Sequence, residues 1–286
     1  MKLPAFEYAS PETVEEAVLL LSAHPGEAKI ISGGQSLLPT MAYRLAQPRL
    51  LVDLGRIASL ARVEIGETEI LIGARTRWAD IERDPQLLQA HPLLVEAIRH
   101  VAHYQVRNRG TVGGSLAHAD PAAELPGIAV ACDATLRIIG PGHERTIEAD
   151  AFFLGPLSTS LAQDELILSI HFPVWPKDRR WAFQKFSRRA GDFALAGIAL
   201  FYDHDANGRM SNVHIGAIGA CQRPRRLFQA EAALEGRLAE DAAIERACQA
   251  AHDEVDPTDD IHASATYRRS LIATLLRRAL RQSTGR

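Results

Sequence analysis

The sequence is poor in cysteine, and its three cysteines, Cys132, Cys221 and Cys248, lie far apart. None belongs to a Cys-x-x-Cys pair, whereas an iron–sulfur cluster usually needs four thiolates. We therefore expect no cluster on this chain, and we expect each cysteine to be a small buried apolar residue.

Recognisable metal motifs are also missing. The histidines are dispersed, and only His100 and His103 have a spacing that could place them on one helical face. No third ligand is near them, and the His-Glu-x-x-His pattern is absent. The sequence predicts no metal site.

Long apolar runs and a basic excess are lacking as well. No run approaches the roughly 20 residues that span a bilayer, and the amino terminus has Lys2 and Pro4 but no signal-like stretch. The formal net charge of −3 gives no broad basic face for nucleic acid. These absences predict a cytoplasmic protein without a membrane span or a nucleic-acid partner.

Two kinds of functional pattern do not occur. The dinucleotide fingerprint Gly-x-Gly-x-x-Gly after a strand is absent, which disfavours a Rossmann site. No paired carboxylates and no nucleophile–base spacing mark a substrate pocket.

Two glycine-centred segments are present instead, at residues 32–39 (SGGQSLLP) and 110–115 (GTVGGS). Glycine has no Cβ to hold a ligand away, and successive backbone amides in such turns can form an anion site. Each segment therefore predicts a stretch of amides open to a phosphate-bearing cofactor. For either segment alone, a tight turn without a ligand remains an alternative.

The regular elements follow from hydrophobic periodicity and turn residues. Ser10 and Pro11 indicate a helix start, and a hairpin is expected around residues 66–68. Other helices are predicted at 92–103, 122–131 and 267–282, and strands at 28–31, 50–54, 135–139, 166–172, 181–187, 195–202 and 210–218. The arginines of the last helix, at positions 268, 269, 277, 278 and 281, are expected on its polar flank, either solvated or docked to an acidic subunit.

Three further stretches, at 115–124 (SLAHADPAAE), 185–192 (KFSRRAGD) and 260–269 (DIHASATYRR), carry a family resemblance. With the glycine segments, they make the chain resemble the FAD-binding medium subunit of the molybdenum hydroxylases. That group contains bacterial carbon monoxide dehydrogenase and the N-heterocycle dehydrogenases, with xanthine dehydrogenase as a fused-chain relative. The likeness runs through essentially all 286 residues.

The resemblance implies an α+β fold with three parts. Residues 1–55 and 56–175 would form the two halves of an FAD-binding region of the vanillyl-alcohol-oxidase/PCMH type. Residues 176–286 would form a smaller α+β domain with a three-stranded sheet and helices, after the proline-rich stretch at 173–176.

The resemblance also implies a role. The chain would hold FAD noncovalently, receive electrons from two [2Fe-2S] clusters on a small subunit, and pass them to an external acceptor. The molybdenum cofactor would lie on a large subunit, and the complex would pair into a dimer of heterotrimers. The hydroxylated substrate would bind elsewhere, although residues 106–110 lean toward the N-heterocycle dehydrogenases.

Residue-by-residue matching gives the implied cofactor site. The first group would wrap the diphosphate: Ile30, Ile31, Ser32, Gly33, Gly34, Gln35, Ser36 and Leu37. The second group would close the opposite side or line the remaining pocket: Val101, Thr111, Gly113, Gly114, Ser115, Asp120, Glu124, Ile167, Lys185 and Phe193. No catalytic or metal-binding residue is implied on this chain.

Four of these positions, with two neighbouring arginines, carry more specific expectations. Lys185 would lie near the flavin ring and raise its reduction potential, or would be a solvent-exposed strand lysine. Asp120 would line the site or cap a helix starting near residue 121, and Glu124 would meet the sugar or adenine end. Phe193 stands where several relatives have tyrosine, so it keeps apolar packing but lacks a hydroxyl. Arg107 or Arg109 would add long-range attraction for the diphosphate.

Two other functions remain open from the sequence. One is a stand-alone FAD-dependent oxidoreductase with the same FAD-binding fold. The other is an assembly protein that has kept the fold and lost the cofactor, which the intact glycine turns disfavour.

Overall fold

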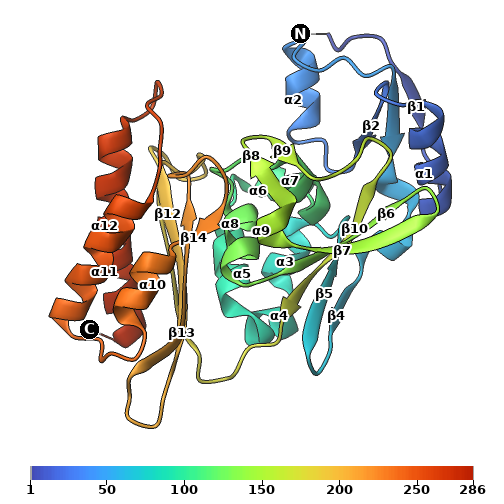
Figure 1. The fold of residues 1–286 in the computed structure, drawn as a ribbon. Coiled ribbons are helices and arrows are strands. Elements are labelled where there is room, and N and C mark those ends of the chain that lie inside the picture. Colours follow the sequence, from blue (N-terminus) through green and yellow to red (C-terminus); the bar gives the residue numbers. More distant parts are fainter. Residues whose placement is uncertain (1, 286) are drawn as a thin grey trace.

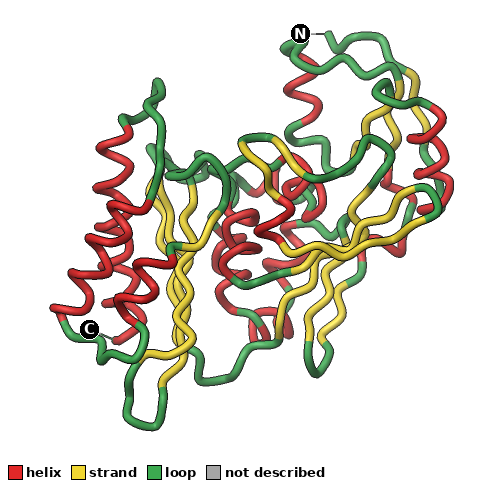
Figure 2. The backbone as a smooth tube through the Cα atoms, in the orientation of Figure 1, coloured by secondary structure: helices red, strands yellow, loops and turns green. Residues whose placement is uncertain are grey.

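The computed structural model describes residues 2–285, and its strands form three larger sheets and one two-stranded sheet. Figure 1 shows a small amino-terminal unit at one side, a central sheet with helices, and a carboxy-terminal sheet backed by helices at the other side. Figure 2 shows the central helices lying between the central sheet and the carboxy-terminal sheet. No helix within residues 2–285 is long and apolar enough to cross a membrane.

The amino-terminal unit is a parallel three-stranded sheet of order β1-β3-β2 with one long helix against it. Its elements are β1 (Glu7–Ala9), α1 (Val14–Ala23), β2 (Ala28–Ile31), α2 (Leu37–Ala42) and β3 (Leu50–Asp53). The cap of α1 is Thr13, which accepts a hydrogen bond from the Glu16 amide at 3.1 Å, so the predicted start at Ser10 is wrong by one turn.

The central sheet is antiparallel, with order β4-β5-β10-β6-β7. Its strands are β4 (Val63–Ile65), β5 (Glu69–Gly73), β10 (Leu166–Pro173), β6 (Thr135–Gly140) and β7 (His143–Glu148), which confirms the predicted hairpin around residues 66–68. Four short segments also belong to this part of the chain: η1 (Leu54–Arg56), η2 (Ala58–Ala61), β8 (Phe153–Gly155) and β9 (Ser158–Thr159).

The central helices pack on one face of this sheet. They are α3 (Trp78–Arg83), α4 (Pro85–Ala90), α5 (Pro92–Arg99), α6 (Tyr104–Arg107), α7 (Val112–His118), α8 (Glu124–Ala131) and α9 (Ala149–Phe152). The predicted helix at 92–103 ends earlier, at Arg99, and Ala102 just beyond it has a left-handed conformation with φ of 42° that cannot continue the helix. The chain then restarts as α6.

The carboxy-terminal sheet has order β11-β12-β13-β14. It contains the three predicted long strands, β11 (Arg180–Phe186), β12 (Ala196–His204) and β13 (Met210–Ile218), and a two-residue edge strand that the sequence did not indicate, β14 (Arg225–Arg226). The helices α10 (Phe228–Leu234), α11 (Asp241–Glu254) and α12 (Ala265–Thr284) cover one face. Arg268 of α12 is buried, donating to the carbonyls of Leu195 and Gly219, so its predicted place on the polar flank is wrong.

Helix α8 joins the central region to the carboxy-terminal sheet. A Cβ on Gly127 would lie 2.3 Å from Cγ1 of Ile218, and a Cβ on Gly216 would lie 2.6 Å from that of Ala131. Small residues therefore let α8 approach β13 closely. One apolar core, which includes Ile128, Phe201 and Ile218, spans this junction.

Candidate functional site

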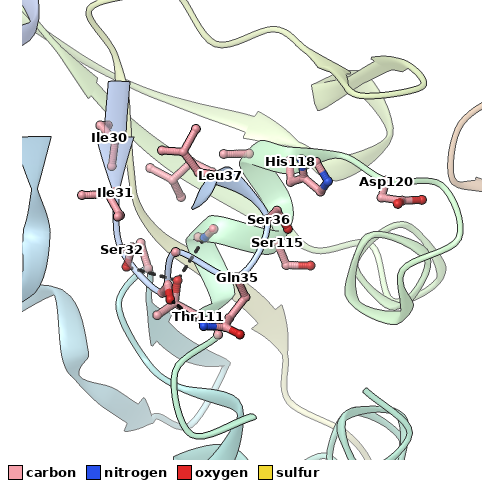
Figure 3. Close-up of a pocket in the computed structure, with 18 of the residues that line it drawn as sticks. Ile30, Ile31, Ser32, Gln35, Ser36, Leu37, Thr111, Ser115, His118 and Asp120 are labelled. Atoms are coloured by element: carbon pink, nitrogen blue, oxygen red, sulfur yellow. Dashed lines mark hydrogen bonds between the residues drawn. The ribbon is translucent and has the colours of Figure 1, made fainter. Parts of the chain in front are cut away.

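A cavity of about 790 Å³ lies where the amino-terminal unit, the central region and one carboxy-terminal loop meet. This volume is within the range of roughly 300–1,000 Å³ that is usual for sites of organic ligands. Figure 3 shows the end of β2, the start of α2 and helix α7 converging on it. Residues from all three predicted parts of the chain therefore contribute to one cavity.

The cavity brings together all of the predicted site residues except Lys185. The residues that line it are Ile30, Ile31, Ser32, Gly33, Gly34, Gln35, Ser36, Leu37, Val101, Thr111, Gly113, Gly114, Ser115, Asp120, Glu124, Ile167 and Phe193. The stretches that supply them are up to 163 positions apart in the sequence, from Ile30 to Phe193.

The two glycine segments touch each other. The Thr111 hydroxyl donates to the Ser32 hydroxyl at 3.1 Å, a contact drawn in Figure 3. A Cβ on Gly33 would lie 2.4 Å from the carbonyl oxygen of Arg109 and 2.8 Å from Cα of Gly110. The predicted convergence is thus observed, and the space that Gly33 leaves is filled by the backbone of the other segment.

The first segment has unused backbone donors. Among the hydrogen bonds of residues 2–285, none has the amide of Gly33, Gly34, Gln35 or Ser36 as its donor. Gly34 has φ of +71°, a conformation that favours glycine. Successive free amides of this kind can bind an oxyanion such as a diphosphate.

The second segment has no such stretch of donors. The amides of Val112 and Gly113 donate to the carbonyls of Thr76 and Ala74 at 3.0 and 2.7 Å. The Gly114 amide donates to the Thr111 hydroxyl at 3.3 Å, and the Ser115 amide donates to the Thr111 carbonyl. The expectation of free amides here is therefore wrong, because these amides hold α7 in place.

Asp120 lines the cavity after the end of α7. Its Oδ1 accepts a hydrogen bond from the Ala122 amide at 2.8 Å, but α8 begins at Glu124 and its capping position is Ala123. Asp120 thus forms a turn before the helix without capping it. Its neighbour His118 also lines the cavity.

Lys185 lies behind Glu124, outside the cavity lining. Its ammonium is 2.5 Å from Oε1 of Glu124 and donates to the carbonyl of His100 at 3.0 Å. Burial raises the pKa of the Glu124 carboxyl, and Lys185 opposes that rise. Because removing one partner leaves a buried charge unpaired, losing either side chain is expected to cost about 3–5 kcal/mol.

The two arginines expected near the diphosphate differ in their surroundings. Arg107 pairs with Glu82 at 2.9 Å and donates to the carbonyls of Val101 and Ala102, so it fixes the backbone beside the cavity. Arg109 is exposed and has no ion pair within residues 2–285.

One wall of the cavity was not predicted. It is formed by residues of the segment after β8: Leu157, Thr159, Leu161, Ala162, Gln163 and Glu165. The buried Glu165 carboxylate binds Arg145 through both oxygens and accepts from the Ala162 amide, and the arginine contact lowers its pKa to about 2. The segment has no glycine pattern or periodicity that would have revealed it.

The opening of the cavity is partly apolar. Phe193, on the loop between β11 and β12, has 60% of its surface exposed, and Leu157 has 61%. Deeper in the cavity, Ile167 is buried on β10. Such walls suit the flat face of an aromatic ligand.

The cysteines are buried, as predicted, and burial raises the pKa of the Cys221 and Cys248 thiols to about 12 and about 11. Within residues 2–285, no group of three or more histidine, cysteine, aspartate or glutamate side chains could hold a metal ion.

Comparison with protein families gives two adjoining matches. Residues 4–175 match the FAD binding domain in molybdopterin dehydrogenase, and residues 181–283 match the CO dehydrogenase flavoprotein C-terminal domain.

Individual proteins are similar over their whole length. The chain is 41% identical to the nicotine 6-hydroxylase medium subunit of Paenarthrobacter nicotinovorans, with 100% of both chains covered. It is 35% identical to the carbon monoxide dehydrogenase medium chain of Hydrogenophaga pseudoflava, covering 99% of this chain and 98% of that one.

Solved structures agree with the fold. A chain of carbon monoxide dehydrogenase from Hydrogenophaga pseudoflava superposes with a TM-score of 0.96 at 36% identity, covering 100% of this chain and 99% of that chain. A chain of quinoline 2-oxidoreductase from Pseudomonas putida 86 superposes with a TM-score of 0.95 at 33% identity, with the same coverage.

Proposed function

The chain belongs to the family of FAD-binding medium subunits of molybdopterin dehydrogenases, and from this premise we propose that it carries electrons from iron–sulfur clusters on a partner subunit to an external acceptor. It is the flavoprotein component of an oxidoreductase. The single observation that best supports the proposal is the row of unused amides at residues 33–36, facing a large cavity.

The cavity residues fit FAD in chemical character. The free amides of the first segment and the hydroxyls of Ser36 and Ser115 suit the diphosphate, which needs several donors. The carboxylates of Asp120 and Glu124 suit the hydroxyls and amine of the adenosine part. The apolar side chains of Ile167 and Phe193 suit the ring system.

Bound FAD supplies an exchange between one-electron and two-electron carriers, which matches clusters to acceptors that take two electrons. The chain's own residues bind and orient it. We propose that Lys185 acts on the flavin only across Glu124, since its ammonium is paired there. The names of the relatives refer to chemically different compounds, including nicotine, carbon monoxide and caffeine. This variety supports a substrate site on another subunit.

The proposal extends to the assembly. Two partner subunits, a small one with [2Fe-2S] clusters and a large one with the molybdenum cofactor, would join this chain in a cytoplasmic dimer of heterotrimers. We also propose divisions after residues 55 and 175. Mass measurement of the purified complex tests the assembly, and limited proteolysis between residues 174 and 179 tests the second division.

The electron path can be tested without knowing the substrate. The complex that co-purifies with this chain is reduced with dithionite and mixed with an acceptor dye, with its flavin present or removed. We expect the clusters to be reoxidised at least about tenfold faster with flavin, and re-added FAD to restore the rate. Equal rates would show that electrons leave by another route.

Two further results separate the alternatives. Acid precipitation should leave the yellow colour in the supernatant, because FAD is held noncovalently; colour in the pellet contradicts this. Steady turnover by the isolated chain would favour a stand-alone oxidoreductase. A purified complex without flavin absorption would favour an assembly protein.

A further inference from the structure

A second cavity, of about 160 Å³, lies on the other side of the contact between the glycine segments. Two of its lining residues, Ser32 and Thr111, also line the large cavity, so their hydroxyl contact is part of the wall between the two. The remaining lining residues are Asp53, Gly55, Arg75, Arg77, Asn108 and Arg109.

Three arginines therefore border one small space. Arg75 and Arg77 follow strand β5, and Arg109 follows α6. Within residues 2–285, none of the three has an ion pair; Arg75 uses only its Nε, which donates to the carbonyl of Ile57 at 3.2 Å. Most of their donor groups are free to bind a ligand.

Three other arginines in this part of the chain are paired with glutamates. Arg56, Arg62 and Arg107 each lie within 4 Å of a glutamate oxygen, at 2.5, 3.3 and 2.9 Å. Other arginines without an ion pair within residues 2–285, such as Arg83 and Arg246, lie on separate helices, α3 and α11, whereas Arg75, Arg77 and Arg109 line one cavity. Their convergence without a carboxylate partner points to a ligand that is itself an anion.

The charge of the cavity indicates which anion. Asp53 is its one carboxylate, and its oxygens already accept from the Tyr8 hydroxyl at 2.5 Å and the Gly55 amide at 2.8 Å. Three guanidinium charges less one carboxylate charge leave two positive charges. A phosphate group carries about 1.5 to 2 negative charges at pH 7. Ser32, Asn108 and Thr111 add neutral polar groups around it.

We propose that this cavity is a second anion site, which binds a phosphate group at Arg75, Arg77 and Arg109 while the large cavity holds the flavin. The phosphate is either the free ion or the monoester end of a larger molecule. The volume holds one such group and excludes a whole nucleotide, since a single water occupies about 30 Å³ in the liquid.

The test is calorimetric titration of inorganic phosphate into the full chain with FAD in excess, at about 0.15 M ionic strength. We expect saturable binding of one phosphate per chain. The double variant Arg77→Gln with Arg109→Gln should bind at least about tenfold more weakly, since each charge-assisted contact contributes about 1.5–3 kcal/mol. Arg246→Gln, which removes an exposed arginine on α11, is the matched control and should bind normally.

Two more measurements keep the result interpretable. Arg77→Lys retains the charge without the forked geometry and should bind with intermediate affinity. Titration with glycerol 3-phosphate identifies the source: equal or tighter binding indicates a monoester, and weaker binding indicates the free ion. Thermal denaturation checks that each variant is folded.

The proposal is overturned if phosphate binds only when FAD is absent, because the ion would then occupy the diphosphate site. It is also overturned if the flavin-loaded chain shows no saturable binding, or if Arg246→Gln weakens binding as much as the double variant. Failure of the chain to bind FAD would count against the proposed function, and the arginine variants would still decide the phosphate site.

Discussion

The two glycine segments look alike in sequence and differ in what their backbones do. Residues 33–36 keep their amides free and face the large cavity, whereas the amides of residues 112–115 are all donated within the protein. The first segment can thus bind an anion directly. The second positions α7 and supports the first through the contact of Thr111 with Ser32.

This difference separates two reasons for a glycine pair. At Gly33 the missing Cβ lets another backbone approach, with the Arg109 carbonyl only 2.4 Å from where the Cβ would lie. At Gly113 the missing Cβ lets α7 approach Ala74, because a Cβ at this position would lie 2.6 Å from the Cβ of Ala74. In both cases glycine permits protein packing first, and the cofactor site is a consequence of that packing.

The largest effect is expected from Gly33→Val. The side chain would push the two segments apart, so the flavin content of the purified protein should fall at least about tenfold, with a loss of stability of about 1–3 kcal/mol from overpacking. Flavin-to-protein ratio and thermal denaturation measure these effects. Gly155→Val is the control, because no atom lies within 4 Å of its Cβ position. Full flavin retention in Gly33→Val would contradict the claim that the close approach at Gly33 forms the cofactor site.

The segment at residues 157–165 forms a third part of the wall of the large cavity, and the ion pair of Glu165 with Arg145 holds it in place. The variant Glu165→Gln tests this contribution. The pKa of Glu165 is lowered from 4.5 to about 2, so its ionised form stabilises the fold above about pH 4.5 and this contribution is lost as the pH falls toward 2. The variant should therefore be less stable at pH 7, by about 3–4 kcal/mol at roughly 1.4 kcal/mol per unit. The difference should shrink at pH 3.

Urea denaturation of both proteins at the two pH values measures this difference. Glu67→Gln, at an exposed turn position, serves as the control and should change little at either pH. A difference for Glu165→Gln that stays constant between pH 7 and pH 3 would argue against the ion pair.

A smaller effect is expected from Thr111→Val, which keeps the shape of the side chain. It removes the contact with Ser32 and the cap on the Gly114 amide, a loss of about 1 kcal/mol. Flavin affinity, measured by fluorescence titration, should fall by less than about tenfold. Ser32→Ala removes only the first contact and should have a smaller effect. If Thr111→Val lost as much flavin as Gly33→Val, the second segment would have to bind the diphosphate itself.

The sequence predicted the elements that depend on local patterns. Both glycine segments, the hairpin around residues 66–68 and the three long carboxy-terminal strands lie where periodicity and turn residues placed them. The resemblance to the family predicted that the two segments would lie on opposite sides of one diphosphate. Their direct contact, which joins Ser32 to Thr111 across 79 positions, was not predicted.

What the sequence could not predict depends on distant partners. The amides of Val112 and Gly113 are satisfied by carbonyls at Thr76 and Ala74, which no local pattern connects to them. Nothing in the sequence around Lys185 indicated that its partner would be Glu124, 61 positions away. The second cavity, with Arg75, Arg77 and Arg109 in its lining, likewise forms only when separate loops come together.

The most direct test of the account is amide hydrogen exchange of the full chain with and without FAD. We predict that the amides of residues 33–36 exchange quickly in the flavin-free protein and become strongly protected when FAD binds. The amides of residues 112–115 should be protected in both states, because they are already hydrogen-bonded. Unchanged exchange at residues 33–36 on FAD binding would contradict the central claim that these amides hold the cofactor.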